Sequence, residues 1–469
     1  MIEGKNIHSV LNTESDKENP FANCALGRKP FAEALTNVID TYSGGLVLAI
    51  NSSWGSGKTT FINMWRDMLS LTKPGEIPYC AEILNAWEHE YFEDPILAVL
   101  SCLKSFLPDE NENHIEAANK LIGALQGIKP AKKGLAKTII SLFTMGNGGD
   151  LVDGVDEGVK AYKDAKETHY RYKETAISDY VNEINAFNDF KEAFSAYINY
   201  IAEETGHPVI IFVDELDRCN PKYSVALLEK IKHLFSTPNL IFVLAIDKEQ
   251  LCSSIRGYFG SDGIKAEEYL RRFIDIEVSL PYADNETFCN SVLRKLGISS
   301  TMRSHAVQDL CEIIGSVSET QKLSLRQIEK VCILCGMGFK THRYDTLPFF
   351  LSIPLAVLKC FKDDIFQEIY SKQISMSALY EVISPMFART SKTPENAYSL
   401  YKFLLLYQYY CAIDGHFLKD RTLIDGDGKI VVGDNCQSII SIINEVKKDL
   451  DKYDFSRALI AMNLYFDML

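Results

Sequence analysis

The stretch AINSSWGSGKTTF, residues 49–61, contains the residues whose types and spacing most clearly suggest chemistry. Gly55 and Gly57 allow the backbone to turn so that its amides face inward, and Lys58 and Thr59 follow directly. Inward amides at the start of a helix form a cradle for an anion. The lysine would then reach the β- and γ-phosphates of a nucleotide, and the threonine hydroxyl would bind Mg²⁺. The plainer interpretation is a Gly/Ser turn between a strand and a helix.

The first position of this loop departs from the usual pattern G-x-x-x-x-G-K-[ST], because Ser52 stands where the pattern has glycine. We expect serine to be tolerated unless the backbone there needs a positive φ, which would cost on the order of 1 kcal/mol. The residues predicted to bind the nucleotide are Ser53, Trp54, Gly55, Ser56, Gly57, Lys58, Thr59 and Thr60.

Two acidic residues end a second apolar run, PVIIFVDELDRC, at residues 208–219. An acid at the end of a strand beside an anion cradle can hold a metal ion, which assigns Asp214 to Mg²⁺ together with Thr59. The next carboxylate, Glu215, can polarise the attacking water as a general base. By itself an acidic strand-to-loop turn is common, but both motifs in this order predict binding and hydrolysis of ATP or GTP.

Four further residues are candidates for catalysis. Asp247 ends the run NLIFVLAI and would lie near the γ-phosphate, or would cap the helix that follows, or both. Arg271 and Arg272 end a helix and could reach the nucleotide of a neighbouring subunit; the alternative is a surface pair held by salt bridges. Arg326 lies on a helix beyond the expected sheet and could contact the γ-phosphate from a lid.

An alternation of strands and helices is expected to position these residues. Short apolar runs between turn signals predict strands at residues 45–50, 79–87, 208–214, 239–246 and 274–280. Segments with helical spacing separate these runs, which predicts a parallel sheet covered on both faces. After Pro281 the pattern is helical to Leu469, apart from a predicted hairpin or loop at 425–435.

The composition is that of a folded soluble protein, with 469 residues, 46% of them hydrophobic and 24% charged, and a net charge of −14. This charge opposes a nucleic-acid partner. The cluster Lys129, Lys132, Lys133 and Lys137 fits a solvated basic loop better than a binding patch. No apolar run reaches the roughly 20 residues that span a bilayer, so no membrane span is predicted.

Twelve cysteines are scattered through the expected strands and helices, which favours reduced, buried thiols in a cytoplasmic protein. The pair Cys332 and Cys335 has the spacing of a metal site. It lies in an apolar helical run without a second pair, so buried thiols are expected there too. The sequence holds no readable hydrolase motif of the Ser, Cys or His type, so any cleaving activity is expected on another chain.

Together these stretches resemble the KAP family of P-loop NTPases, a branch of the AAA+/STAND-like additional-strand ATPases. The resemblance covers roughly residues 20–335. It rests on SSWGSGKT, ILNAWEHEYFEDPILAVL, IIFVDELDRC, FVLAIDKEQL, YLRRFIDIEVSLP and SLRQIEK, in that order. The leading segment ANCALGRKPFAEAL is also similar to the family, in which Gly-Arg precedes the first helix. Many members carry membrane helices between the two Walker motifs, whereas AKTIISLFTMG is too short and too polar to span.

The resemblance implies an α/β fold: a parallel-sheet P-loop NTPase core with a helical insertion, followed by an α-helical lid and a C-terminal helical domain. The expected boundaries are an irregular lead-in at 1–30, the core at 31–285 with the insertion at about 110–183, the lid at 286–345 and the C-terminal domain at 346–469. The resemblance also implies the roles given above for the glycine-rich loop, for Asp214 and Glu215, and for the three candidate arginines. Asp217 and Arg218 belong to the tail of the second Walker motif, with an inter-subunit or structural role.

The resemblance further implies ATP and Mg²⁺ as ligands, a homo-oligomer, and a switch or motor that controls a partner effector protein in bacterial defence against phage. Nucleotide at a subunit boundary would be read by the neighbour's arginine and by the lid. Two alternatives remain open. One is a non-hydrolysing scaffold in which nucleotide is structural, and the other is an ATPase stimulated by nucleic acid.

Overall fold

A computed structural model describes most of the chain outside one long segment. The described ranges are 18–42, 44–71, 77–91, 95–103, 174–260, 263–282, 284–298, 304–341, 349–387 and 394–412, with single positions or short groups at 106–124 and 423–460. Most of the predicted insertion, the cluster Lys129 to Lys137 and the predicted hairpin or loop at 425–435 lie outside the described residues.

Five parallel strands form one sheet in the order β2-β3-β4-β1-β5. Their bounds are β1 Leu46–Asn51, β2 Ala81–Asn85, β3 Val209–Asp214, β4 Leu240–Ile246 and β5 Ile276–Ser279. The strand β4 therefore lies between the strand that leads into the glycine-rich loop and the strand that ends in the two acids. This arrangement confirms the predicted α/β fold with a parallel sheet.

The register of the strands brings the two motifs to one edge of the sheet. Asn51 at the end of β1 pairs with Ile246, and Asp214 at the end of β3 pairs with Ala245 of the same strand β4. On the other side of β3, Asn85 pairs with Asp214. Because all strands run the same way, the loops after β1, β2, β3 and β4 gather where ligands bind in open parallel sheets.

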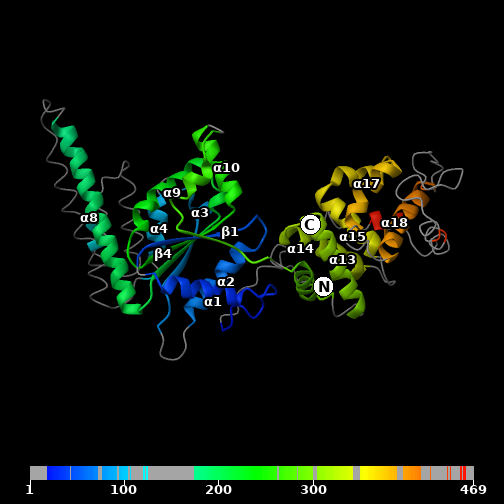
Figure 1. The fold of residues 1–469 in the computed structure, drawn as a ribbon, viewed down its shortest axis with the longest axis horizontal. Helices are drawn as coiled ribbons and strands as arrows, with labels where there is room; N and C mark the ends of the chain where they lie inside the picture. Colours follow the sequence, from blue (N-terminus) through cyan, green and yellow to red (C-terminus); the bar gives the residue numbers. More distant parts are fainter. Residues whose placement is uncertain are drawn as a thin grey trace.

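Helices cover both faces of the sheet (Figure 1). One face carries α1 (Lys29–Asp40) and α2 (Lys58–Ser70), and the other carries α4 (Pro95–Leu103), α8 (Glu174–Thr205), α9 (Pro221–Phe235) and α10 (Lys248–Phe259). The side chains of β1 alternate between the two cores: Leu46, Leu48 and Ile50 face α1 and α2, whereas Val47 and Ala49 face the opposite layer. Burial on both faces explains the uninterrupted apolar runs in the sequence.

Helices follow the sheet to the end of the described chain. They are α12 Asn285–Lys295, α13 Ser304–Thr320, α14 Leu325–Thr341, α15 Phe349–Phe361, α16 Asp363–Tyr370, α17 Met376–Phe387 and α18 Pro394–Ala412. One continuous hydrophobic core runs through them, from Phe288 to Leu459. The predicted lid and the predicted C-terminal helices thus share a core, and the boundary between them stays a prediction.

Two chemical features of the described ranges complete this picture. Within them, no helix is both long and apolar enough to cross a membrane. The eleven cysteines that fall in these ranges are all free thiols, and Cys332 and Cys335 are buried. A hydrogen bond with Cys289 together with burial raises the pKa of Cys332, and burial raises that of Cys335, which keeps both thiols protonated and unreactive.

Candidate nucleotide-binding site

The loop between β1 and α2 has the backbone geometry of an anion cradle. Gly55 and Gly57 have φ values of 76° and 85°, a left-handed conformation that side chains rarely adopt, and Gly57 is the N-cap of α2. The non-glycine residues with positive φ do not include Ser52. Serine at the first position therefore does not have to adopt a positive φ, which is the condition under which we expected it to be tolerated.

Lys58 lies under this loop with its ammonium group directed at the loop carbonyls. Its Nζ donates to the carbonyl oxygen of Ser52 at 2.6 Å and to that of Ser53 at 3.2 Å. Only 8% of the residue is exposed, and this burial lowers the pKa of Lys58, while three nearby aspartates oppose the shift. The ammonium is thus held beside the cradle, where a phosphate would compensate its charge.

Asp214 and Thr59 form the pair expected to hold Mg²⁺. The Asp214 carboxylate is buried, accepts a hydrogen bond from the Glu215 amide at 2.9 Å, and accepts another from the Thr59 hydroxyl. Burial raises the pKa of Asp214, although both hydrogen bonds act in the opposite direction. A hydroxyl and a carboxylate placed side by side are suitable oxygen ligands for this ion, whose remaining ligands would be phosphate oxygens and water.

The predicted general base, Glu215, is held by a neighbour. Its φ of 59° is in the left-handed region, which is strained for a residue with a side chain. Its Oε1 lies 2.7 Å from Nη1 of Arg218, and the Arg218 guanidinium lies over the ring of Trp87, 6.0 Å from the ring centroid. Trp87 belongs to the short helix α3 (Ala86–His89), which Asn85 caps by accepting from two of its amides.

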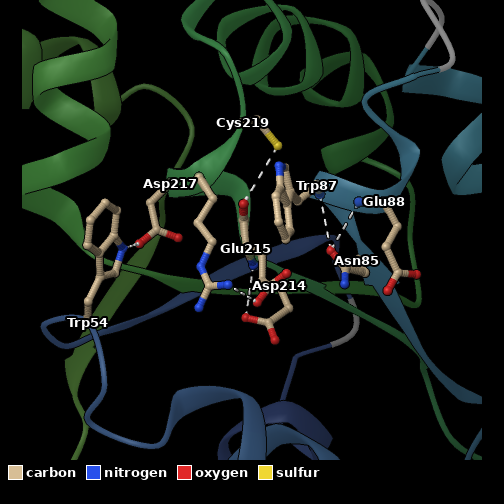
Figure 2. Close-up of polar contacts among 9 residues, drawn as sticks. Trp54, Asn85, Trp87, Glu88, Asp214, Glu215, Asp217 and Cys219 are labelled. Carbon is tan, nitrogen blue, oxygen red and sulfur yellow. Dashed lines mark hydrogen bonds and ion pairs between the residues drawn. The ribbon is translucent and has the colours of Figure 1, made fainter. Parts of the chain in front are cut away.

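Trp54 ties the loop to two aspartates that follow the strands β3 and β4, and Figure 2 shows its contact with the first of them, Asp217. Its indole N–H donates to the buried carboxylate of Asp217, in the short helix Leu216–Arg218. Its backbone amide donates to Oδ2 of Asp247 at 3.1 Å, and the Asp247 amide donates to Asp217 at 3.2 Å. The other Asp247 oxygen accepts from Gln250 and caps α10. These contacts give Asp217 a structural role and show the predicted cap at Asp247.

The predicted lid lies against the loop through the start of α14. A Cβ atom added to Gly55 would lie 2.9 Å from Oγ of Ser324, and one added to Gly57 would lie 3.7 Å from Leu325. The next residue, Arg326, is exposed and lines the same cavity as the loop. The lid helices therefore form one wall of the site.

The cavity between the loop and these helices has a volume of about 370 Å³. Its lining includes Lys58, Thr59, Asp214 and Glu215, together with Trp54, Gly55, Gly57, Thr60, Asp217, Arg218 and Arg326. Ser53, Ser56 and Asp247 are not part of its lining. The carbonyls of Ser53 and Ser56 accept from Lys58 and Arg28, and the Asp247 carboxylate accepts from the Trp54 amide. Arg271 and Arg272, which follow α11 (Ala266–Leu270), are exposed and lie outside this cavity.

The cavity is also lined by residues to which the sequence pattern gives no role at the site. They come from the lead-in, Asn23 to Leu26, and from the lid helices, where Lys295 and Glu329 line the wall. Burial raises the pKa of Glu329 to about 7, against the effect of Arg326 and Lys295. A charged residue on an amphipathic helix normally marks the solvent side, so the sequence carried no signal for this pair.

These features define a P-loop NTPase: a parallel sheet with β4 between β1 and β3, a glycine-rich loop entering a helix, and an acidic pair at the end of β3. The family model described as the KAP family P-loop domain matches residues 28–333, more than half of the chain. The chain therefore belongs to the KAP family, as the sequence resemblance predicted. No curated protein matches it significantly. Membership implies binding of a nucleoside triphosphate with Mg²⁺ and suggests its hydrolysis.

The loop geometry predicts the effect of a single methyl group. We expect Gly55→Ala to weaken ATP binding at least about tenfold, because it forces a side chain into a left-handed backbone and against Ser324. The control is Gly44→Ala, where a Cβ meets no atom within 4 Å, and its affinity should stay within about twofold of wild type. Calorimetric titration with ATP and Mg²⁺ measures both, and equal affinities of the two variants would contradict the assigned loop.

Burial of Asp214 predicts that replacing this acid with a neutral residue raises the free energy of unfolding. Because the pKa of Asp214 is raised on folding, the free energy of unfolding falls as the pH rises through the titration of this carboxyl. We expect Asp214→Asn to raise the unfolding temperature of the nucleotide-free protein by a few degrees at neutral pH. The difference from wild type should shrink as the pH is lowered.

Thermal denaturation in a chelator across a pH series measures this effect. Asp189→Asn, at an exposed position of α8, is the matched control and should leave the unfolding temperature unchanged. A destabilised Asp214→Asn variant, or a gain that does not depend on pH, would show that the buried carboxylate is not a cost to the fold.

Proposed function

We propose that this protein binds and hydrolyses ATP and acts as an oligomeric switch or motor that controls a partner effector. The observation that carries the proposal is the convergence of Lys58, Thr59, Asp214 and Glu215 in the lining of a single cavity. Together they supply a cation for the phosphates, two oxygen ligands for Mg²⁺ and a carboxylate for the attacking water.

Each of these residues has one step in the proposed mechanism. Lys58 exchanges its bonds to the carbonyls of Ser52 and Ser53 for a phosphate, while Thr59 and Asp214 hold the metal. The Mg²⁺ ion, when bound, neutralises charge on the β- and γ-phosphates. Glu215 accepts the proton of the attacking water, which requires its carboxylate to leave Arg218 first.

One observation favours a second function, that of a scaffold in which nucleotide is bound without being hydrolysed. The 2.7 Å ion pair with Arg218 occupies an oxygen of Glu215, the residue that would act as the base. If this pair persists with nucleotide bound, turnover is very slow and ATP serves to stabilise the fold. The two functions differ in one measurable property, the dependence of turnover on Glu215.

The hydrolytic function predicts that Glu215→Gln binds ATP with near-normal affinity and loses turnover by at least about 100-fold, because the amide cannot accept the proton. Lys58→Ala should abolish binding itself. Phosphate release and nucleotide titration on the same preparations measure both quantities. Unchanged turnover in Glu215→Gln would remove the assigned base. Negligible turnover in the wild-type protein, with nucleotide co-purifying, would favour the scaffold.

An oligomer is proposed because the arginines after α11 lie outside their own chain's cavity. Arg271 and Arg272 are both exposed, a position from which they could reach a neighbour's nucleotide. In the same proposal Arg326 acts from the lid of its own chain, and Asp247 reports on the loop through the Trp54 amide. The effector would be a separate protein, and the proposed setting, bacterial anti-phage defence in the cytoplasm, is supported by the family resemblance.

A complementation experiment tests the trans-acting arginines. Glu215→Gln and the double variant Arg271→Ala/Arg272→Ala should each be nearly inactive alone. Mixed in equal amounts they should recover about a quarter of wild-type turnover, because about a quarter of the interfaces pair an intact base with intact arginines. Lys265→Ala, an exposed cation beside α11, should retain full turnover alone. A mixture as inactive as its components would rule out action between subunits.

A further inference from the structure

Arg28 connects the nucleotide-binding loop to the start of the lid. It is 5% exposed and immediately precedes α1. Its Nη2 donates to the carbonyl of Ser56 at 3.0 Å and to that of Pro281 at 3.3 Å, and its Nη1 donates to the carbonyl of Gly57 at 3.4 Å. Ser56 and Gly57 belong to the loop, whereas Pro281 lies between β5 and the first lid helix, α12.

Arg28 lies where the sheet domain meets the lid helices. In the lead-in just before it, Phe21 packs into the core beneath the sheet and Leu26 packs against the core of the lid helices. Pro281 and Tyr282, here called the connector, link the sheet to Asp284, the N-cap of α12. The guanidinium therefore bonds to two segments whose relative position determines where the lid lies.

The chemistry of this contact requires arginine. When the loop turns its amides toward an anion, the carbonyl of Ser56 is left to find a donor elsewhere, whereas that of Gly57 already accepts from the Phe61 amide at 3.0 Å. A guanidinium offers several N–H groups in a rigid plane and can serve two separate segments at once. A lysine ammonium at Arg28 would preserve the charge but would lack this fixed fork.

In the part of the chain that the structure describes, no carboxylate balances the charge on Arg28. Among the described residues no carboxylate forms an ion pair with it or acts on its pKa, which burial lowers, and its Nε is buried without a hydrogen-bond partner. Burying an uncompensated cation is costly. Arg28 lines the same cavity as Lys58, so an anion in the loop would offset this cost.

We propose that Arg28 is a positioning residue that couples the nucleotide-binding loop to the connector, so that a bound triphosphate and the observed placement of α12–α14 stabilise each other. This inference rests on the proposed ATP binding. It assigns to the Gly-Arg pair before α1 a duty that neither Walker motif performs: reporting the occupancy of the loop to the lid. By linkage, whatever holds the lid in place raises the affinity of the loop for nucleotide.

Two variants at Arg28 distinguish the effect of its positive charge from the effect of its planar set of N–H donors. Arg28→Lys should bind a slowly hydrolysed ATP analogue within about threefold of wild type, because the cation remains. Arg28→Met should lose about tenfold or more. The control is Arg66→Met, which removes an arginine of α2 that pairs only with the adjacent Asp67 at 2.7 Å among the described residues. Its affinity should not change.

The diagnostic measurement is amide hydrogen exchange of the full chain, with and without the analogue, at residues 52–60 and 281–298. In the wild-type protein and in Arg66→Met, the analogue should slow exchange in both segments. In Arg28→Lys it should slow exchange in the loop and leave the connector and α12 unchanged. Thermal melts of each variant verify that it is folded.

Each outcome decides between the possibilities. Slowed exchange at the connector in Arg28→Lys would overturn the coupling while leaving ATP binding intact. Normal affinity and a normal connector response in Arg28→Met would overturn any role of Arg28 toward the nucleotide. If the wild-type protein does not bind the analogue at all, it is the proposed function that fails, and the inference fails with it.

Discussion

A loop that offers its amides to an anion must satisfy its remaining polar groups with partners from elsewhere in the chain. In this protein those partners come from four places. Lys58 donates to the carbonyls at the start of the loop, and Arg28 donates to those at its end. Asp247 accepts from the Trp54 amide, and the carbonyl of Ile246 accepts from Ser52 at 3.1 Å. The strand order, the lead-in and the acidic turn all serve this one requirement.

The same arrangement concentrates charge that the fold alone does not balance. Burial acts against the charged forms of Lys58, Arg28 and Asp214, and the carboxylate of Glu215 is satisfied by Arg218. A triphosphate with its metal ion brings both signs of charge to these groups. A ligand that brings such charges would offset the cost of burying these groups, which is the thermodynamic basis on which a ligand can shift a conformational equilibrium.

The parts of this site that were predictable from sequence are local. The apolar runs, the glycines before Lys58 and the two acids after β3 each lie within a few residues, where periodicity and spacing carry the signal. The contacts that hold the site together span the chain: Trp54 and Asp217 are 163 residues apart, and Arg28 and Pro281 are 253 apart. Nothing in one sequence specifies such pairs. The ion pair at Glu215 depends on a side-chain conformation, which spacing does not determine.

The continuous core shared by α12 to α18 has a mechanical consequence. Because one hydrophobic core runs from Phe288 to Leu459, a rotation of any of these helices would have to move the others with it, as a single lever. The short end of the lever rests on Gly55 through Ser324, and the long end carries α17 and α18 away from the sheet (Figure 1). A small rotation at the connector becomes a larger displacement at those distant helices. If the loop and the connector are coupled as proposed, α17 and α18 are the helices that nucleotide binding would displace most.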